Sequence, residues 1–547
     1  MENIKKVILE AVPEAVVEDK TPLTVTVEPD KFRHLAKALR YHAELPFDYL
    51  AMLTGTDEGE KLMVTYLLCP SKDLSIEIAV KTGTSDRENP LLYTVTDLWE
   101  TAHFNEREVY AMLGIRFINN PDMRRFFLNS DWIGYPLRKD YDTNPVLNAV
   151  SIESRDIIDI APRIMETATG ELKEENVPIF EKDDYLINIG PQHPSTHGVM
   201  HFRVALDGEI VKKIDVHSGY IHRGIEKLSE KLTYPQILHF TDRLDYLSAN
   251  INRHGLCMCV EKAAGIEVPE RAQYIRTIMD ELNRIDSHLV AWGTMCMDLG
   301  STTAFIYGMR EREEILKIFE KNTGGRLIIN YNVLGGVMFD IQPDFQSDVK
   351  AFIKVMRKAL IEYDKLFTGN VIAVGRMKNL GVLSNEDAIS YAVTGPAGRA
   401  SGFSCDIRKH APYALYGLEK VQNSFKEIVR HTGDAFDRYL NRLDEIEESI
   451  KIIEQLIDDI PEGDYLAKTK AIIKLPEGEY YQRVEAGRGE FGVYIESRGD
   501  KTPYRLKFRS PSMAAVSVMP LICKDEKISD FIGIGGSMDY VIPDIDR

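Results

Sequence analysis

A loop rich in glycine and proline carries the residues best suited to chemistry. It reads GPQHPSTHG from Gly190 to Gly198, and its two histidines, His193 and His197, are four positions apart. Pro194 disfavours a helix, so the spacing does not place both imidazoles on one helix face. Three interpretations fit these residues: a pair of metal ligands, histidines hydrogen-bonded within a tight turn, or a rigid turn that presents an imidazole to a ligand. The metal interpretation lacks further ligands nearby in sequence, whereas an imidazole can donate a proton near neutral pH.

The elements that must position this loop belong to a second, larger unit that begins at Asp184. Strands are predicted at Tyr185–Ile189 and Val199–Leu206, on either side of the loop. Three long helices are predicted after them, at residues 234–264, from near Pro269, and at residues 434–458. The middle helix has one apolar face, made of Ile275, Ile278, Met279, Leu282, Ile285, Leu289 and Trp292. We therefore expect a mainly helical bundle with β elements at both ends.

The residues before this unit divide into a compact domain and a connecting segment. Strands are predicted at Leu23–Val27, Lys61–Leu68 and Ser75–Lys81, and helices at Asp30–Ala43 and Asp97–Leu113. Residues 146–183 are polar and charge-dense without a sustained period, which indicates a linker whose Ile and Phe side chains could dock on a neighbour. The predicted organisation is α+β, with a domain at residues 1–145, a linker at 146–183 and a domain at 184–547.

Composition limits the classes of function. A chain of 547 residues is too long for one hydrophobic core. Its net charge of −18 argues against binding to nucleic acid or adhesion to anionic lipid through basic patches. No apolar stretch approaches the roughly 20 residues of a membrane span, and the N-terminal residues lack a signal-peptide pattern. We expect a cytoplasmic protein that reaches a membrane only through partner subunits.

The cysteines are scattered and form no C-x-x-C pair. They are Cys69, Cys257, Cys259, Cys296, Cys405 and Cys523. The single C-x-C pair, Cys257 and Cys259, cannot complete a zinc or iron–sulfur site. We therefore expect buried free thiols, and no metal or flavin bound by this chain.

Several motifs in order resemble one family, the D (49 kDa) subunit of complex I, NADH:quinone oxidoreductase. GPQHPSTHG is similar to the signature loop of that family. The similarity continues through Val216–Leu228, Phe240–Ala249, Glu281–Leu289, Met297–Phe305, Arg310–Ile315, Arg399–Lys409, Gly433–Tyr439, Glu485–Ile495 and the tail GSMDYVIPDIDR. Residues Asn105–Phe117 and Pro121–Tyr141 resemble the C (30 kDa) subunit. The chain thus resembles a fused C–D subunit, which implies an α/β-sandwich C-type domain followed by a D-type domain like the large subunit of hydrogenases.

The resemblance implies a quinone site. In the family, the second histidine of the loop and the tyrosine of RLDY bind the two ends of a quinone headgroup; here these are His197 and Tyr246, with Asp298 behind the histidine. Quinone reduction needs two electrons and two protons, so a phenol and an imidazole are suitable donors. An acidic partner orients the histidine and raises its proton affinity. From the residues alone, Tyr246 could instead pack in a core with its hydroxyl satisfied.

Further positions are implied to support this site. His193, Thr196 and Gly198 of the loop are predicted to help bind the quinone, and Arg243, three residues before Tyr246, is predicted to share its helix face. The resemblance implies that Arg243 faces a terminal 4Fe–4S cluster held by an adjacent subunit. It also implies partners: cluster-bearing B-type and I-type subunits, a membrane-arm H-type subunit, and the cytoplasmic face of a bacterial cell membrane.

One departure from the family concerns the cluster. The family often has a histidine near this cluster, at the position where the segment Gly324–Tyr331 has Ile328. Loss of a hydrogen-bond donor lowers the reduction potential of a cluster. We therefore expect a low, pH-independent midpoint potential, suited to menaquinone.

Other functions are less compatible with these motifs. Gly487–Gly492 satisfies G-x-G-x-x-G, but a strand-like segment follows it instead of a helix, so a dinucleotide site is not expected. The D family resembles nickel–iron hydrogenases, yet Gly219–Gly224 and Gly536–Arg547 contain no cysteine, which excludes that activity. A ferredoxin-linked complex that reuses the same kind of subunit, and a scaffold that binds no quinone, remain as alternatives. The electron donor is not encoded in this chain.

Overall fold

The computed structural model describes residues 2–142, 159–193, 196 and 198–547. His197 lies outside the described residues, as do the boundary expected near residue 145 and the first part of the expected linker.

The first unit is built on a five-stranded sheet with the order β1-β2-β5-β4-β3. Its elements are α1 (Glu2–Ala11), β1 (Val16–Glu18), β2 (Leu23–Thr26), α2 (Pro29–Arg40), β3 (Tyr49–Asp57), β4 (Leu62–Cys69) and β5 (Ile78–Thr84). Strands β2 and β5 are parallel and the other neighbours are antiparallel. Strand β5 begins three residues later than predicted, because Ser75 is held in a turn by hydrogen bonds to the Asp73 carboxylate.

A second sheet incorporates part of the segment that was predicted to be a linker. Its strands are β6 (Leu91–Tyr93), β7 (Arg116–Ile118), β8 (Ile160–Glu166) and β9 (Leu172–Pro178), in that order, with α3 (Ala102–Leu113) between β6 and β7. The hairpin β8–β9 joins β7 through the pairing of Ile118 with Ile164. Ile164 and Ala161 are buried, so the apolar residues of this charged segment do dock on the first unit.

The second unit opens with a three-stranded sheet and the predicted loop. Strands β10 (Tyr185–Ile189), β13 (His201–Asp207) and β14 (Ile210–His217) pair in that order. The predicted strand Val199–Leu206 is divided, because β12 (Gly198–Val199) pairs instead with β11 (Gln192–His193). Strands β11 and β12 thus form a separate two-stranded sheet.

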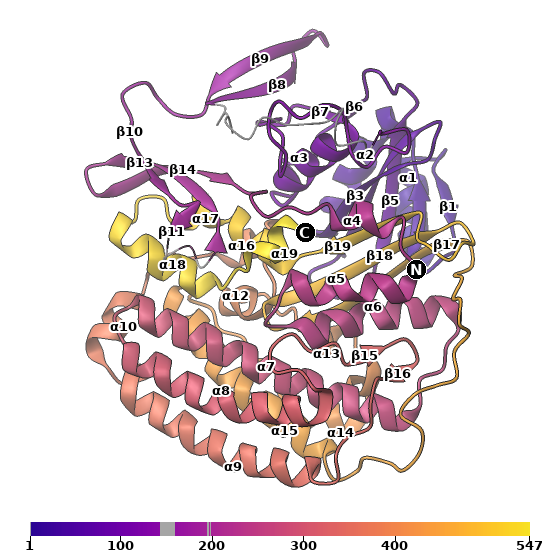
Figure 1. Ribbon diagram of the computed structural model, residues 1–547. Coiled ribbons are helices and arrows are strands. Elements are labelled where there is room, and N and C mark those ends of the chain that lie inside the picture. The colour runs from indigo at the N-terminus through magenta and orange to yellow at the C-terminus, as the bar shows by residue number, and fades with distance from the viewer. Residues whose placement is uncertain (1, 143–158, 194–195, 197) are drawn as a thin grey trace.

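Long helices form the body of the second unit (Figure 1). They are α7 (Glu270–Asp298), α8 (Thr302–Thr323), α9 (Phe345–Tyr363) and α15 (Ala435–Leu456). The apolar face predicted on α7 is buried, and Trp292 on this helix stacks on Tyr363 of α9 at 4.0 Å between ring centroids. The buried apolar face of α7 is as predicted, and the helices are consistent with the predicted mixture of helices and strands.

The helix predicted over residues 234–264 is two helices, α5 (Tyr234–Leu244) and α6 (Ala249–Ala264). Asp245 has extended backbone angles (φ −111°, ψ 97°) and ends α5. Its carboxylate accepts a hydrogen bond from the Leu247 amide at 3.0 Å. Such a side-chain contact with nearby backbone competes with helical hydrogen bonding, and the apolar periodicity on either side did not reveal it.

The last elements are a sheet and short helices, and in Figure 1 strands β17 to β19 lie between the first unit and the long helices. Strands β17 (Gly478–Ala486), β18 (Gly489–Ser497) and β19 (Arg505–Arg509) form an antiparallel sheet. The C-terminal segment, defined here as residues 531–546, contains α18 (Phe531–Met538) and α19 (Ile542–Asp546). The remaining elements are α4 (Ile225–Ser229), β15 (Asn332–Val333), β16 (Gly336–Val337), the π-helix η2 (Asp364–Thr368), α10 (Val371–Met377), α11 (Asn385–Ser390), α12 (Gly395–Ala400), α13 (Ile407–His410), η3 (Ala414–Gly417), α14 (Glu419–Gln422), α16 (Pro511–Ser517), α17 (Met519–Ile522) and η4 (Ile528–Asp530).

Buried ion pairs join the first unit to the second. Glu108 of α3 pairs with Lys507 of β19 and with Arg547, whose Nη2 lies 2.7 Å from the Glu108 carboxylate. Arg124 pairs with Asp215 of β14 at 2.7 Å. Removing one member would leave a buried charge without its partner, which is costly, so these contacts hold the two units in one orientation.

Candidate functional site

The glycine- and proline-rich loop is fixed by its own backbone. His193 pairs with Gly198 in the β11–β12 ladder. The buried Thr196 hydroxyl lies 2.8 Å from the His193 carbonyl oxygen and 2.6 Å from the Gly198 carbonyl oxygen. His193 is exposed. The Thr196 hydroxyl therefore connects the ends of β11 and β12.

The loop packs directly on the C-terminal segment. A β-carbon added to Gly198 would lie 2.7 Å from Cγ1 of Ile542 in α19. That distance is shorter than carbon atoms tolerate, so only glycine allows this approach. The loop and α19 thus form one wall of the candidate site.

Tyr246 lies in the break between α5 and α6, with 40% of its surface exposed. Burial raises the pKa of Tyr246, while the positive charge of Arg488 acts in the opposite direction. A raised pKa keeps the phenol protonated near neutral pH, so its hydroxyl can donate a hydrogen bond. The alternative of a fully buried core tyrosine does not fit its exposure.

Arg243 occupies the last turn of α5 and is exposed. The prediction that it shares a helix face with Tyr246 is wrong, because α5 ends at Leu244 and Tyr246 is outside the helix. Arg243 forms no hydrogen bond or ion pair with the described residues, whereas the neighbouring Asp245 pairs with Arg488. Its guanidinium is therefore available at the surface beside the helix break.

Asp298 is the last residue of α7 and is half-buried. Its carboxylate lies against α18, since a β-carbon on Gly536 would be 2.9 Å from Asp298 Oδ2. Burial raises the pKa of Tyr540, and the charge of Asp298 adds to this effect. Asp298 is thus held against the same C-terminal segment as the loop.

Sequence reasoning missed the residues that connect these parts. Arg488 and Asp539 form ion pairs beside Tyr246, with Arg488 Nη1 2.8 Å from the Asp245 carboxylate and Nη2 3.2 Å from that of Asp539. Arg488 stands in the G-x-G-x-x-G pattern that was rejected as a dinucleotide site. The pattern spans the turn of the β17–β18 hairpin and the start of β18, so a strand follows the turn, as predicted, and not a helix. The only sign of Arg488 in the sequence was an arginine between two glycines, Gly487 and Gly489.

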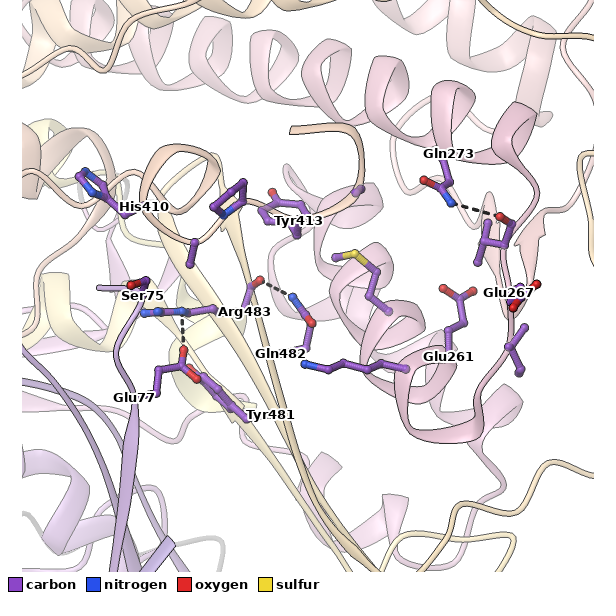
Figure 2. A pocket seen from close by; sticks show the side chains of 17 residues that line it. Ser75, Glu77, Glu261, Glu267, Gln273, His410, Tyr413, Tyr481, Gln482 and Arg483 are labelled. Carbon is purple, nitrogen blue, oxygen red and sulfur yellow. Dashed lines mark hydrogen bonds and ion pairs between the residues drawn. The ribbon is translucent and has the colours of Figure 1, made fainter. Parts of the chain in front are cut away.

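One cavity lies away from these residues. It measures about 730 Å³ and opens where the first unit meets α6, α7 and β17. Figure 2 shows its polar lining, with the ion pair between Glu77 and Arg483 at 2.8 Å. None of the site residues predicted from the sequence lines this cavity. The ion pair joins the first unit to β17 at the edge of this cavity.

The cysteine prediction is confirmed, since all six thiols are free and buried. Within the described residues, no group of three or more histidine, cysteine or acidic side chains is arranged to hold a metal ion. None of the helices in the described ranges combines the length and apolar character needed to cross a membrane.

Comparisons with known families match both units. Residues 25–146 match the family described as respiratory-chain NADH dehydrogenase, 30 Kd subunit. Residues 298–474 and 467–547 match the family described as respiratory-chain NADH dehydrogenase, 49 Kd subunit. The class defined by these matches is that of respiratory-chain NADH dehydrogenase subunits, with both parts in a single chain.

Full-length relatives have the same arrangement. The C/D subunit of NADH-quinone oxidoreductase from Phocaeicola vulgatus is 59% identical over 501 residues, which cover 91% of this chain and 95% of the relative. The C/D protein of Bacteroides thetaiotaomicron is 54% identical over 520 residues, 93% of this chain and 97% of the relative. The separate D protein of NADH-quinone oxidoreductase from Bacillus cereus is 46% identical over 369 residues, 67% of this chain and 100% of the relative. The chain belongs to the family of fused C/D subunits of NADH-quinone oxidoreductase.

Proposed function

We propose that this chain forms the quinone headgroup site of a proton-translocating NADH-quinone oxidoreductase. One observation carries the proposal: three separate parts of the sequence converge on the C-terminal segment. Gly198 contacts Ile542, Asp298 contacts Gly536, and the break that holds Tyr246 is tied to Asp539 through Arg488. Such convergence of polar groups from distant elements is typical of a binding site.

Tyr246 is proposed as one donor to the quinone. Its hydroxyl is protonated at neutral pH and its ring is partly accessible. A phenol placed at a quinone oxygen stabilises the negative charge that develops there during reduction. The same hydroxyl can pass its proton to the reduced oxygen.

His197 is proposed as the second donor, with Asp298 behind it. The proposal rests on the family resemblance for His197 and on the position of Asp298 against α18. A carboxylate near an imidazole favours the protonated ring. His193, Thr196 and Gly198 would then act as the rigid frame of the loop.

Electrons are proposed to arrive from a 4Fe–4S cluster in an adjacent subunit, next to the exposed Arg243. The expected partners are B-type and I-type cluster proteins and an H-type membrane protein, at the cytoplasmic face of the cell membrane. The names of the C/D relatives favour NADH as the electron source of the whole complex over ferredoxin. The exposed phenol of Tyr246 favours a quinone-binding role over that of a scaffold.

Photolabelling of the intact complex tests this function. A photoreactive quinone analogue should attach to peptides that contain residues 190–199 and 245–248, and excess unmodified quinone should abolish that labelling. The cavity of Figure 2 supplies the control, because peptides that carry Glu77 and Gln273 should not be protected. Competable labelling only outside the two expected peptides would contradict the proposal.

A further inference from the structure

Arg488 is buried in the turn of the β17–β18 hairpin and is bound by three other elements. Its Nη1 lies 2.8 Å from the nearer carboxylate oxygen of Asp245, between α5 and α6, and 3.1 Å from Ser287 Oγ of α7. Its Nη2 lies 3.2 Å from Asp539, which directly follows α18. A planar guanidinium can satisfy several acceptors at once, which an ammonium group cannot do in the same geometry. Arg488 thus joins four parts of the chain at one point.

The backbone of this turn packs tightly against Ser248 and Ser287. The Gly487 amide donates a hydrogen bond to Ser248 Oγ at 3.3 Å. A β-carbon on Gly487 would lie 2.7 Å from Ser287 Oγ and 3.0 Å from Ser248 Oγ. The turn is therefore seated against α6 and α7, so the guanidinium of Arg488 has a fixed position beside Asp245, the residue that precedes Tyr246.

The break between α5 and α6 depends on a charged residue that needs this partner. Asp245 is buried, and its carboxylate accepts the Leu247 amide and the Arg488 guanidinium. Without Arg488 the carboxylate would be a buried charge beside Asp539, a second carboxylate. Arg442 of α15, whose Nε is 3.6 Å from Asp539, would be the remaining cation nearby.

We propose that Arg488 is the positioning residue for Tyr246, holding the break between α5 and α6 so that the phenol faces the quinone. This inference rests on the proposed function of Tyr246 as a quinone donor. The charge of Arg488 also stabilises negative charge on the Tyr246 oxygen as its proton is given up. The charged groups that act on the phenol are the cation Arg488 and the two carboxylates of Asp245 and Asp539.

The test compares variants of the intact complex by their quinone turnover and by NADH oxidation with an artificial acceptor, which reports the steps before the quinone. Arg488→Gln should lower kcat with quinone by at least about tenfold, with the artificial-acceptor rate unchanged. Arg488→Lys keeps the charge and loses the forked geometry, so it should assemble normally and recover part of kcat. Arg498→Gln, at an exposed arginine that directly follows β18, is the control and should leave kcat and KM for quinone unchanged.

A double-mutant cycle separates this inference from the proposed function. If Arg488 acts through Tyr246, Arg488→Gln should lower kcat by less than about twofold in a Tyr246→Phe background, because the two effects are not additive. Two results would overturn the positioning role and leave the proposed quinone site intact. One is that the losses of kcat from the two substitutions are additive. The other is that both Arg488→Lys and Arg488→Gln have wild-type kinetics. Wild-type kinetics in Tyr246→Phe alone would overturn both proposals.

Discussion

The α-carbon of Gly190 lies so close to the backbone of Met200 that a β-carbon at residue 190 would be 1.8 Å from the Met200 carbonyl oxygen. Gly190 also has φ +92°, in the region that favours glycine. Gly190 begins the loop of the candidate site and Met200 follows it. The close approach of the two chain segments therefore sets the base of the loop.

Replacing Gly190 by alanine should displace the loop. The added β-carbon meets a backbone atom that cannot move away cheaply, and the positive φ adds about 1 kcal/mol of strain. We expect quinone turnover of the complex to fall with the artificial-acceptor rate retained. Gly208→Ala is the matched control, because Gly208 also has a positive φ, +61°, but no atom within 4 Å of its β-carbon position. Equal effects of both substitutions would show that the close contact with Met200 does not matter.

Strongly periodic elements could be predicted from the sequence, and breaks caused by individual polar contacts could not. The long helix α7 and the free buried cysteines follow from apolar spacing and composition. The Asp245 carboxylate at the break binds the Leu247 amide and also Arg488, which is 243 positions away, and apolar spacing reveals neither contact. The hairpin β8–β9 was missed because β9 is mostly polar and, in the two strands, only Ala161 and Ile164 are buried.

The candidate site was predictable only in part, and for the same reason. Tyr246 and Asp298 were found through motifs that resemble a family, and the structure places both beside elements of the C-terminal region. Asp539 and Gly536 contribute through their position in space, after α18 and within it. A residue that contributes by close packing or by an ion pair between distant elements cannot be recognised from its type or spacing before the fold is known.

Glu226 provides a test of the charged junction by its pH dependence. Burial alone would raise the pKa of Glu226, but Lys507, Arg505 and Arg547 together lower it to about 2. A folded-state pKa below the unfolded value of 4.5 stabilises the fold fully above pH 4.5, and this contribution is lost as the pH falls toward about 2. Glu226→Gln should lower the free energy of unfolding by about 3 kcal/mol near neutral pH.

Urea unfolding of the full chain at several pH values measures this contribution. The difference between wild type and Glu226→Gln should shrink as the pH falls below 4.5. Glu14→Gln, at an exposed residue of the first unit, should give no difference at any pH. A gap between wild type and Glu226→Gln that grows on acidification would refute the assigned ion pairs.

Ile328 tests the expected potential of the neighbouring cluster. This half-buried residue follows α8, and it stands where the family often has a histidine. We predict a low, pH-independent midpoint for the cluster in the wild-type complex, and a higher, pH-dependent midpoint in Ile328→His, because a donor to a cluster raises its potential. EPR-monitored redox titration on both sides of the imidazole pKa measures it. The exposed neighbour Leu327, changed to histidine, is the control, and a high, pH-dependent wild-type midpoint would sink the prediction.

Substitution of Tyr246 tests the proposed quinone site most directly. Tyr246→Phe removes one hydroxyl and keeps the ring, so assembly and the artificial-acceptor rate should not change. Tyr41→Phe, at an exposed tyrosine of the first unit, controls for the loss of a hydroxyl. Steady-state turnover of the purified complex with quinone is the measurement. We predict a fall of about 100-fold in kcat for Tyr246→Phe and none for Tyr41→Phe; unchanged quinone kinetics in Tyr246→Phe would contradict the role of this phenol as a quinone donor.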